Sequence, residues 1–165
     1  DQLTEPADIL NATRKKIIHH LMHDGSTEGG KDGMDCSLVC FDFKDLKLTY
    51  AAANNPVWIV RENKLLVLPA DKMPIGKHDK DNVPFKQTEV ALQKGDVVYT
   101  FTDGYADQFG GPKGKKYKYK QLEELLVSIY EKPMMMQHDV LRQSLNDWKG
   151  NLEQVDDVCV IGVRI

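Results

Sequence analysis

The sequence predicts an α+β fold, built mostly from antiparallel β-sheets packed with helices. Its hydrophobic period is helical near the N-terminus, strand-like through the centre, and helical again in two later segments before a final apolar run. Short turns join the strand-like segments in the manner of hairpins, which favours antiparallel pairing. The chain therefore runs from a helix through several strands to two helices and a last strand.

The first predicted helix starts at Thr4 and continues to about Met22. Thr4 supplies a capping hydroxyl, and Glu5 and Pro6 are residues favoured in a first helical turn. Apolar residues then recur at helical spacing: Ile9, Leu10, Ile17, Ile18 and Leu21. The polar, glycine-rich stretch 23–35 is expected to form a loop.

Strand-like segments follow this loop: 36–43, 46–53, 54–60, 64–70, 85–93 and 96–102. The first two pairs turn at Lys44-Asp45 and at Glu62-Asn63, and the last of the six is apolar enough to be a central strand. Helices are predicted around 121–131 and 135–149. The final segment, 156–165, is predicted to be a strand too apolar for a sheet edge.

Length and composition limit the possible classes of protein. A chain of 165 residues with 41% hydrophobic residues is expected to form one domain, residues 1–165. A net charge of -3 argues against a dominant nucleic-acid surface, and no apolar run is long enough to cross a membrane. The odd set Cys36, Cys40 and Cys159 argues against disulfides, fits a reducing cytoplasm, and is predicted to lie in the core.

Two acidic positions border apolar strands. Asp103 follows the strand 96–102, and Asp156 and Asp157 precede the last strand. If these strands are antiparallel neighbours, the carboxylates meet at one sheet edge and repel one another unless a cation holds them. Oxygen ligands without a Cys/His set indicate Mg²⁺ or Mn²⁺. Gly104 permits a sharp backbone turn. The alternative is an ordinary Asp-Gly turn with solvated acids.

The stretches "GDVVYTFTDGYADQFGGPKGKKYKYKQ", "AAANNPVW", "KMPIG" and "VDDVCVIGVRI" together resemble a bacterial PPM-type serine/threonine phosphatase of the sporulation stage II protein E-like (SpoIIE-like) subgroup. The motifs keep the family order and match the C-terminal two-thirds of the family domain, an α-β-β-α sandwich. The resemblance implies that Asp103 and Asp156 are catalytic metal ligands. It further implies that Asp157 is an auxiliary ligand, that Gly104 supports the site, and that the complete domain holds two Mn²⁺ or Mg²⁺ ions.

The same resemblance implies a function. A metal-activated water would hydrolyse phosphoserine or phosphothreonine on a small phosphorylated regulator of the anti-anti-sigma type, without a phosphoenzyme. An N-terminal sensor or signalling domain would govern a cytoplasmic phosphatase domain, and a membrane anchor could lie upstream in the full-length protein.

The sequence departs from the family pattern upstream. A Gly-Asp strand motif, whose aspartate bridges both metals, and a Gly-His-Gly segment are not present. We therefore expect a domain that lacks its N-terminal portion and binds metal poorly by itself. The alternative function is a non-catalytic, phosphatase-fold module that binds a regulatory protein.

The basic run 113–120 alternates lysines with tyrosines. A solvated loop is the favoured interpretation; a functional run would steer a phosphoprotein toward Asp103 through Lys113, Lys115 and Lys116 rather than bind nucleic acid. His19 and His23 have the i, i+4 spacing of a ligand pair, but an exposed helix face is favoured because no third ligand accompanies them.

Overall fold

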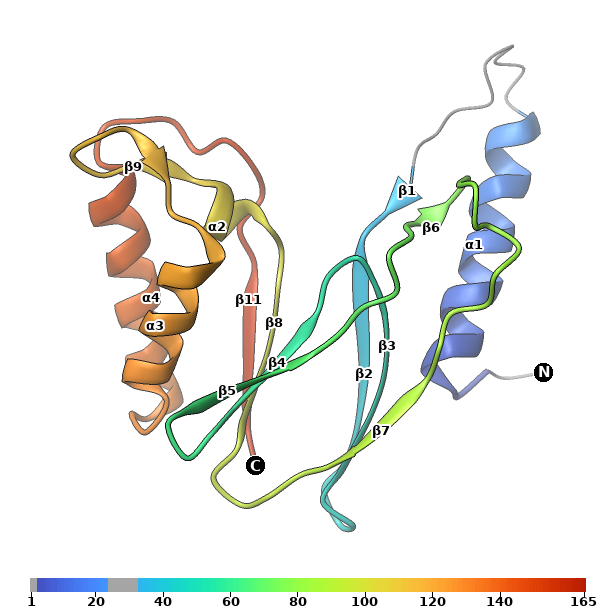
Figure 1. Cartoon of the computed structure of the whole chain (residues 1–165), viewed down its shortest axis with the longest axis horizontal. Helices are drawn as coiled ribbons and strands as arrows, with labels where there is room; N and C mark the ends of the chain where they lie inside the picture. Colours follow the sequence, from blue (N-terminus) through green and yellow to red (C-terminus); the bar gives the residue numbers. More distant parts are fainter. Residues whose placement is uncertain (1–2, 24–32) are drawn as a thin grey trace. The chain divides into compact units, whose positions relative to one another are not determined.

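The structure is a computed structural model that describes residues 3–23 and 33–165 (Figure 1). The chain forms two compact units: unit 1 comprises Asp1–Val57 and Pro69–Leu92, and unit 2 comprises Trp58–Leu68 and Gln93–Ile165. Each contains helix and antiparallel sheet, so the predicted α+β class is confirmed. The assignment of residues 1–165 to one domain stays a prediction.

Unit 1 places one helix beside short antiparallel ladders. Strands β2, β3 and β7 form a three-stranded sheet in the order β2-β3-β7, and β1 pairs with β6. The elements are α1 (Pro6–His23), β1 (Gly33–Met34), β2 (Cys36–Asp42), β3 (Lys47–Ala53), β6 (Ile75–Gly76) and β7 (Thr88–Ala91). The predicted first helix and first hairpin are confirmed. Residues 24–32 of the predicted loop lie outside the described residues.

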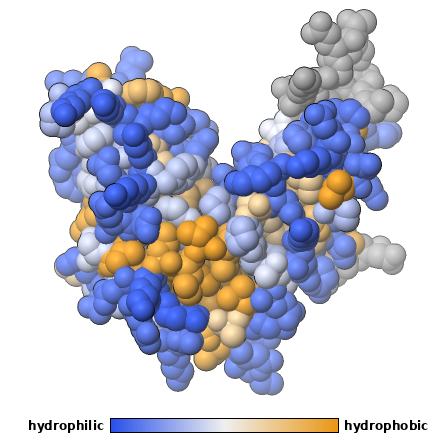
Figure 2. All heavy atoms as spheres, viewed as in Figure 1, coloured by the Kyte–Doolittle hydropathy of each residue, from blue (hydrophilic) through white to orange (hydrophobic). Residues whose placement is uncertain are grey.

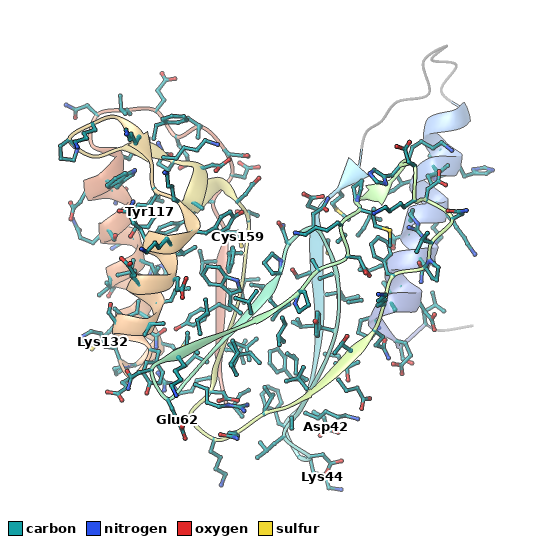
Figure 3. All side chains as sticks on the ribbon, viewed as in Figure 1. Asp42, Lys44, Glu62, Tyr117, Lys132 and Cys159 are labelled. Atoms are coloured by element: carbon teal, nitrogen blue, oxygen red, sulfur yellow. The ribbon has the colours of Figure 1, made fainter. Side chains whose placement is uncertain are left out.

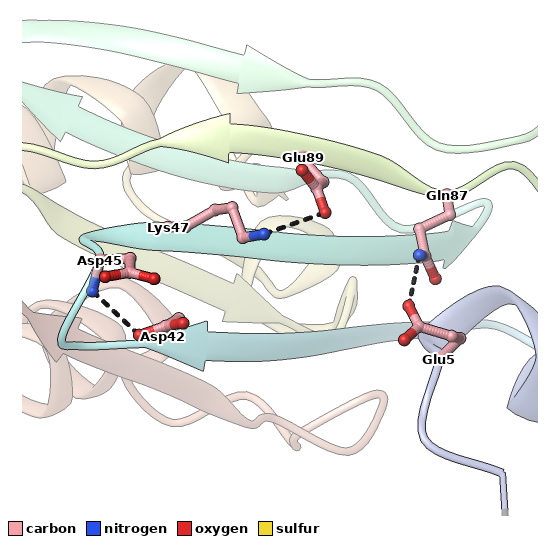
Figure 4. Close-up of polar contacts among 6 residues, drawn as sticks. All are labelled: Glu5, Asp42, Asp45, Lys47, Gln87 and Glu89. Carbon is pink, nitrogen blue, oxygen red and sulfur yellow. Dashed lines mark hydrogen bonds and ion pairs between the residues drawn. The ribbon is translucent and has the colours of Figure 1, made fainter.

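Polar contacts close the β2–β3 hairpin and tie β7 to it (Figure 4). The carboxylate of Asp42 accepts hydrogen bonds from the backbone N–H groups of Lys44 and Asp45, at 3.0 and 2.9 Å. On the neighbouring ladder, Lys47 pairs with Glu89 at 3.1 Å. The Asp42 side chain therefore satisfies backbone N–H groups of the hairpin turn, as in other Asx turns.

Unit 2 is built on a four-stranded sheet in the order β11-β8-β4-β5. Its elements are β4 (Val57–Arg61, shared at Val57 with unit 1), β5 (Lys64–Leu68), β8 (Val97–Phe101), α2 (Gly104–Asp107), β9 (Phe109–Gly110), β10 (Lys115–Lys116), α3 (Tyr119–Ile129), α4 (Met134–Lys149) and β11 (Val160–Arg164). Glu62 and Asn63 both have positive φ, 47° and 60°, which matches the two-residue hairpin turn predicted there.

The core of unit 2 joins helices α3 and α4 to the sheet. Leu122 and Leu126 of α3 are fully buried and pack with Tyr99 and Trp58 of the strands. A buried amide fixes α4: Gln137 accepts a hydrogen bond from the Tyr99 hydroxyl at 2.5 Å and donates to two carbonyl oxygens at the end of α3. Figure 2 shows hydrophobic residues at the surface over the region of strands β4 and β5. In β5, the side chain of Val67 is 53% exposed.

Two predictions about the strands are wrong. Within the described residues, β11 is an edge strand because only β8 pairs with it, and Ile161 is 56% exposed. Cys40 and Cys159 are exposed, and only Cys36 is partly buried, where burial raises the pKa of its thiol. Cys40 shares a face of β2 with Cys36 and Leu38, which pack against the core of unit 1, but it lies nearer the hairpin end of the strand and is exposed there. Cys159 lies just before the edge strand β11, as Figure 3 shows.

No helix within the described part of the chain is long and apolar enough to cross a membrane.

Candidate active site

The acidic ends of two neighbouring strands meet in unit 2. Strands β8 and β11 run antiparallel, from the Val160–Phe101 pair to the Arg164–Val97 pair. Asp103 lies two residues beyond the end of β8, and Asp156 and Asp157 lie a few residues before β11. The three carboxylates are exposed at the same edge of the sheet. The strand pairing on which the sequence prediction depended is therefore present.

Thr102 extends this ladder with its side chain. Its backbone N–H donates to the carbonyl of Cys159 at 3.0 Å. Its hydroxyl donates to the carbonyl of Asp157 at 2.7 Å and accepts from the Cys159 N–H at 2.9 Å. The residue before Asp103 thus fixes the segment that follows Asp156. This role was not predicted from the sequence, although the hydroxyl of Thr102 directly before the Asp103-Gly104 pair was a visible signal for it.

Gly104 allows the two segments to approach closely. A Cβ atom at this position would lie 2.4 Å from the carbonyl oxygen of Asp157 and 3.3 Å from the carbonyl carbon of Asp156. Any other residue would push the two acidic segments apart. The predicted reason for this glycine was a sharp turn, whereas the reason in the structure is the backbone packed against it.

The two principal carboxylates differ in their local contacts. Asp103 sits at the start of α2 with no side-chain capping bond, while its carbonyl accepts the N–H of Asp107 at 2.9 Å. Asp156 accepts the backbone N–H of Asp157 at 2.7 Å on one carboxylate oxygen. The Asp103 carboxylate therefore makes no capping hydrogen bond to α2. The Asp156 carboxylate is oriented by its hydrogen bond from the Asp157 N–H.

The family of the chain follows from a comparison with known protein families. The family described as Stage II sporulation protein E (SpoIIE) matches residues 1–165. The chain belongs to the SpoIIE family. No curated protein sequence matches it closely enough to add a relative.

Solved structures similar to this SpoIIE-family chain share its fold. The SiaA-PP2C domain of Pseudomonas aeruginosa has a TM-score of 0.85 at 24% identity, over 98% of this chain and 61% of that chain. The phosphatase domain of SpoIIE from Bacillus subtilis has a TM-score of 0.62 at 15% identity, over 100% and 75%. The RsbU and RsbW domains of a Mycobacterium tuberculosis protein give 0.63 at 16%, over 94% and 47%. This chain thus spans less than two thirds of the SiaA chain, and its fold is that of PP2C phosphatase domains.

The acidic edge, which consists of Asp103, Asp156 and Asp157, has the type of donor atoms that a hard metal ion prefers but too few of them. Asp103, Asp156 and Asp157 offer oxygen ligands, and Gly104 keeps side-chain carbon out of the space beside the Asp156-Asp157 backbone. Across residues 3–23 and 33–165, however, no group of three or more His, Cys, Asp or Glu side chains is arranged to hold a metal. The described residues at this edge therefore offer oxygen donors of the right type without forming a three-ligand metal site.

The basic run lies close to the acidic edge along the chain. Lys115 and Lys116 form β10, which pairs with β9, and Lys113 lies in the turn between these strands. Lys116 pairs with Asp107 at 2.8 Å, on the helix that begins directly after Asp103. The structure therefore connects one of the three predicted steering lysines to the site. Lys113 and Lys115 stay exposed beside it.

Proposed function

We propose that this chain is the phosphatase domain of a signalling protein and hydrolyses phosphoserine or phosphothreonine on a small regulatory protein. The observation that supports the proposal best is that Asp103 and Asp156 lie at the same end of two paired strands, with Gly104 packed against the Asp156-Asp157 backbone. Membership of the SpoIIE family and a PP2C fold agree with it. The partner would be a phosphorylated regulator of the anti-anti-sigma type, and the compartment the cytoplasm.

In this proposal the carboxylates of Asp103 and Asp156 hold a divalent ion, with Asp157 as an auxiliary ligand. Bound Mn²⁺ or Mg²⁺ would supply the charge that activates water near neutral pH and neutralises phosphoryl oxygens. Thr102 and Gly104 both contact the backbone carbonyl of Asp157, and these contacts would hold the Asp156-Asp157 segment beside Asp103. One of the solved SpoIIE phosphatase domains is described as presoaked with Mn, which is consistent with this choice of ion.

The proposal is tested by phosphate release from a phosphoserine peptide with and without Mn²⁺. The chain is assayed alone and in a version extended upstream through the Gly-Asp motif that the family resemblance implies. We expect Mn²⁺-dependent release in the extended version and a loss of at least about 100-fold on Asp103→Asn or Asp156→Asn. Equal release by the Asn variants would contradict the assigned ligands.

A second function is favoured by one observation. Because the described residues gather no group of three metal-binding side chains, a module that binds a regulatory protein without turnover agrees with the structure as well. If neither version of the chain releases phosphate and both bind the phosphopeptide tightly, the result would support the binding module.

A further inference from the structure

We propose that the β9–β10 hairpin forms a docking pocket for an acidic segment of the phosphoprotein substrate. The lysine pocket, a cavity of about 270 Å³, is lined by four lysines, Lys113, Lys115, Lys116 and Lys118, together with Trp148 and Gln121 among others. Among the residues that the structure describes, none with a carboxylate side chain lines it. This inference rests on the proposed function, because it assigns the segment bound there to the substrate of the same site.

Charge in the pocket is only partly neutralised. Lys116 pairs with Asp107 at 2.8 Å and lies 5.9 Å from the ring centroid of Phe109. Within the described residues, no ion pair involves Lys113, Lys115 or Lys118, and all three are exposed. Three positive charges within six residues therefore face solvent in one place, although the whole chain is slightly acidic. Such a patch attracts an anionic partner.

The pocket is held by close packing of the hairpin on α4. The Gly111 N–H donates to the Trp148 carbonyl at 2.7 Å, and a Cβ at Gly111 would come within 2.7 Å of the indole. The Trp148 indole N–H donates to the Gln108 carbonyl at 3.0 Å, and the ring of Tyr117 packs edge-on against it at 5.3 Å. The lysines are thus carried by a fixed hairpin, whose ordered backbone lowers the entropy lost on binding.

Lys118 adds an independent observation. Its backbone has φ 73° and ψ 149°, a conformation that residues other than glycine rarely adopt. The strain is held by the Lys118 N–H, which donates to the Ala106 carbonyl at 2.7 Å, just after the start of α2. Glycine would adopt the backbone conformation of position 118 without strain. We therefore attribute the lysine at this position to its side chain and not to its backbone.

The position of the pocket fits a segment that flanks the phosphorylated residue. Lys116 contacts Asp107, and the Asp107 N–H bonds to the carbonyl of Asp103 one helical turn away. One turn is about 5.4 Å, and an extended peptide rises about 3.3 Å per residue. An acidic segment in the pocket would therefore begin about two residues from the phosphoserine or further along the substrate. In Figure 2 hydrophilic atoms predominate at the end of unit 2 where Figure 1 places β9.

A protein segment fits better than nucleic acid. A nucleic-acid surface commonly neutralises about 6–10 phosphates along an extended track. The lysine pocket concentrates its charge in a single cavity, and its aromatic ring, Trp148, is packed under glycine and Tyr117 instead of being free to stack on bases.

The experiment measures binding of fluorescein-labelled peptides to the full chain by fluorescence anisotropy. One peptide carries four consecutive aspartates, the first of them about two residues from an alanine that replaces phosphoserine, and its partner carries asparagines instead. We expect binding of the aspartate peptide only, weakened by added salt. The triple variant Lys113→Gln/Lys115→Gln/Lys118→Gln should bind about 5- to 50-fold more weakly. Because no turnover is measured, a failure of the phosphatase proposal leaves this result readable.

A matched control removes the same charge elsewhere in unit 2: Lys64→Gln/Lys94→Gln/Lys132→Gln. These lysines are exposed, and Figure 3 shows Lys132 at the opposite end of unit 2 from Tyr117. The control variant should bind within about twofold of the wild type. A charge-reversed variant, Lys113→Glu/Lys115→Glu/Lys118→Glu, should bind a lysine peptide in place of the aspartate peptide, which shows that the hairpin is still folded.

Three results would overturn the inference. Equal losses in the two glutamine variants would show that only net charge matters. Equal binding of the asparagine peptide would show that the acids are not recognised. Tighter binding of a single-stranded oligonucleotide of equal length, dependent on the same lysines, would assign the pocket to nucleic acid.

Discussion

Replacing Gly104 with alanine tests the packing that holds the acidic edge together. The added Cβ would lie 2.4 Å from the Asp157 carbonyl oxygen, about 1 Å short of ordinary van der Waals contact, and the atom that it meets is backbone. The β11 side of the site must therefore move, at a cost of about 1–3 kcal/mol, as in other overpacked positions. Helix propensity favours alanine over glycine by at most about 1 kcal/mol, so we expect a net loss of stability.

The assay is urea unfolding followed by tryptophan fluorescence. Both tryptophans, Trp58 and Trp148, belong to unit 2, so the signal reports the unit that contains the change. Gly114→Ala is the control, because its φ of 58° strains alanine while no atom lies within 4 Å of the new Cβ. That strain is worth about 1–2 kcal/mol without any displacement of Asp157. An unfolding free energy of Gly104→Ala equal to or above that of the wild type would refute the close approach.

Three further changes have defined outcomes. Asp96→Ala should lower the unfolding free energy by about 3 kcal/mol, because it leaves Arg61 without its two-bond partner at 2.8 and 2.6 Å; an unchanged urea midpoint would contradict this. Burial raises the pKa of Tyr99 from 10.0 to about 12, so the unfolded chain loses this proton at a lower pH than the folded chain. The unfolding free energy should therefore fall by up to about 2–3 kcal/mol as pH rises from 10 to 12. Tyr99→Phe should reduce that fall, and an equal fall in both proteins would count against this account. Lys118→Gly should raise the unfolding free energy by about 1 kcal/mol, because it relieves backbone strain, and should weaken binding of the aspartate peptide. A loss of stability would show that the backbone is not strained.

Periodicity and turn chemistry were sufficient to predict most of the elements. The apolar run before Asp103 became β8, and the Glu62-Asn63 turn adopted the left-handed pair of angles that its hairpin requires. The antiparallel pairing of β8 with β11 was a condition in the sequence argument, and the register in the structure satisfies it. Local patterns carry this information because each strand must bury one face against the same core.

Features that depend on contacts distant in sequence were not predictable. Cys159 and Ile161 lie in an apolar run, yet they are exposed because β11 has one neighbour among the described strands. The bonds of Thr102 and the strain of Lys118 arise from segments about 55 and 12 residues away, which no local pattern contains. The roles of Asp103 and Asp156 came from family resemblance, and geometry adds that they share an edge.

The most direct test of the site is the location of Mn²⁺ by its paramagnetic broadening of backbone amide signals in NMR spectra of this chain. We expect the signals of Gly104 and Asp157 to broaden first. Gly95 and Ile165, hydrogen-bonded at 2.9 Å at the other end of the same two strands, should stay sharp. The Asp103→Asn/Asp156→Asn variant should abolish the selective broadening. Broadening that is uniform, centred on Gly95, or unchanged in the double variant would contradict a divalent-cation site at Asp103 and Asp156.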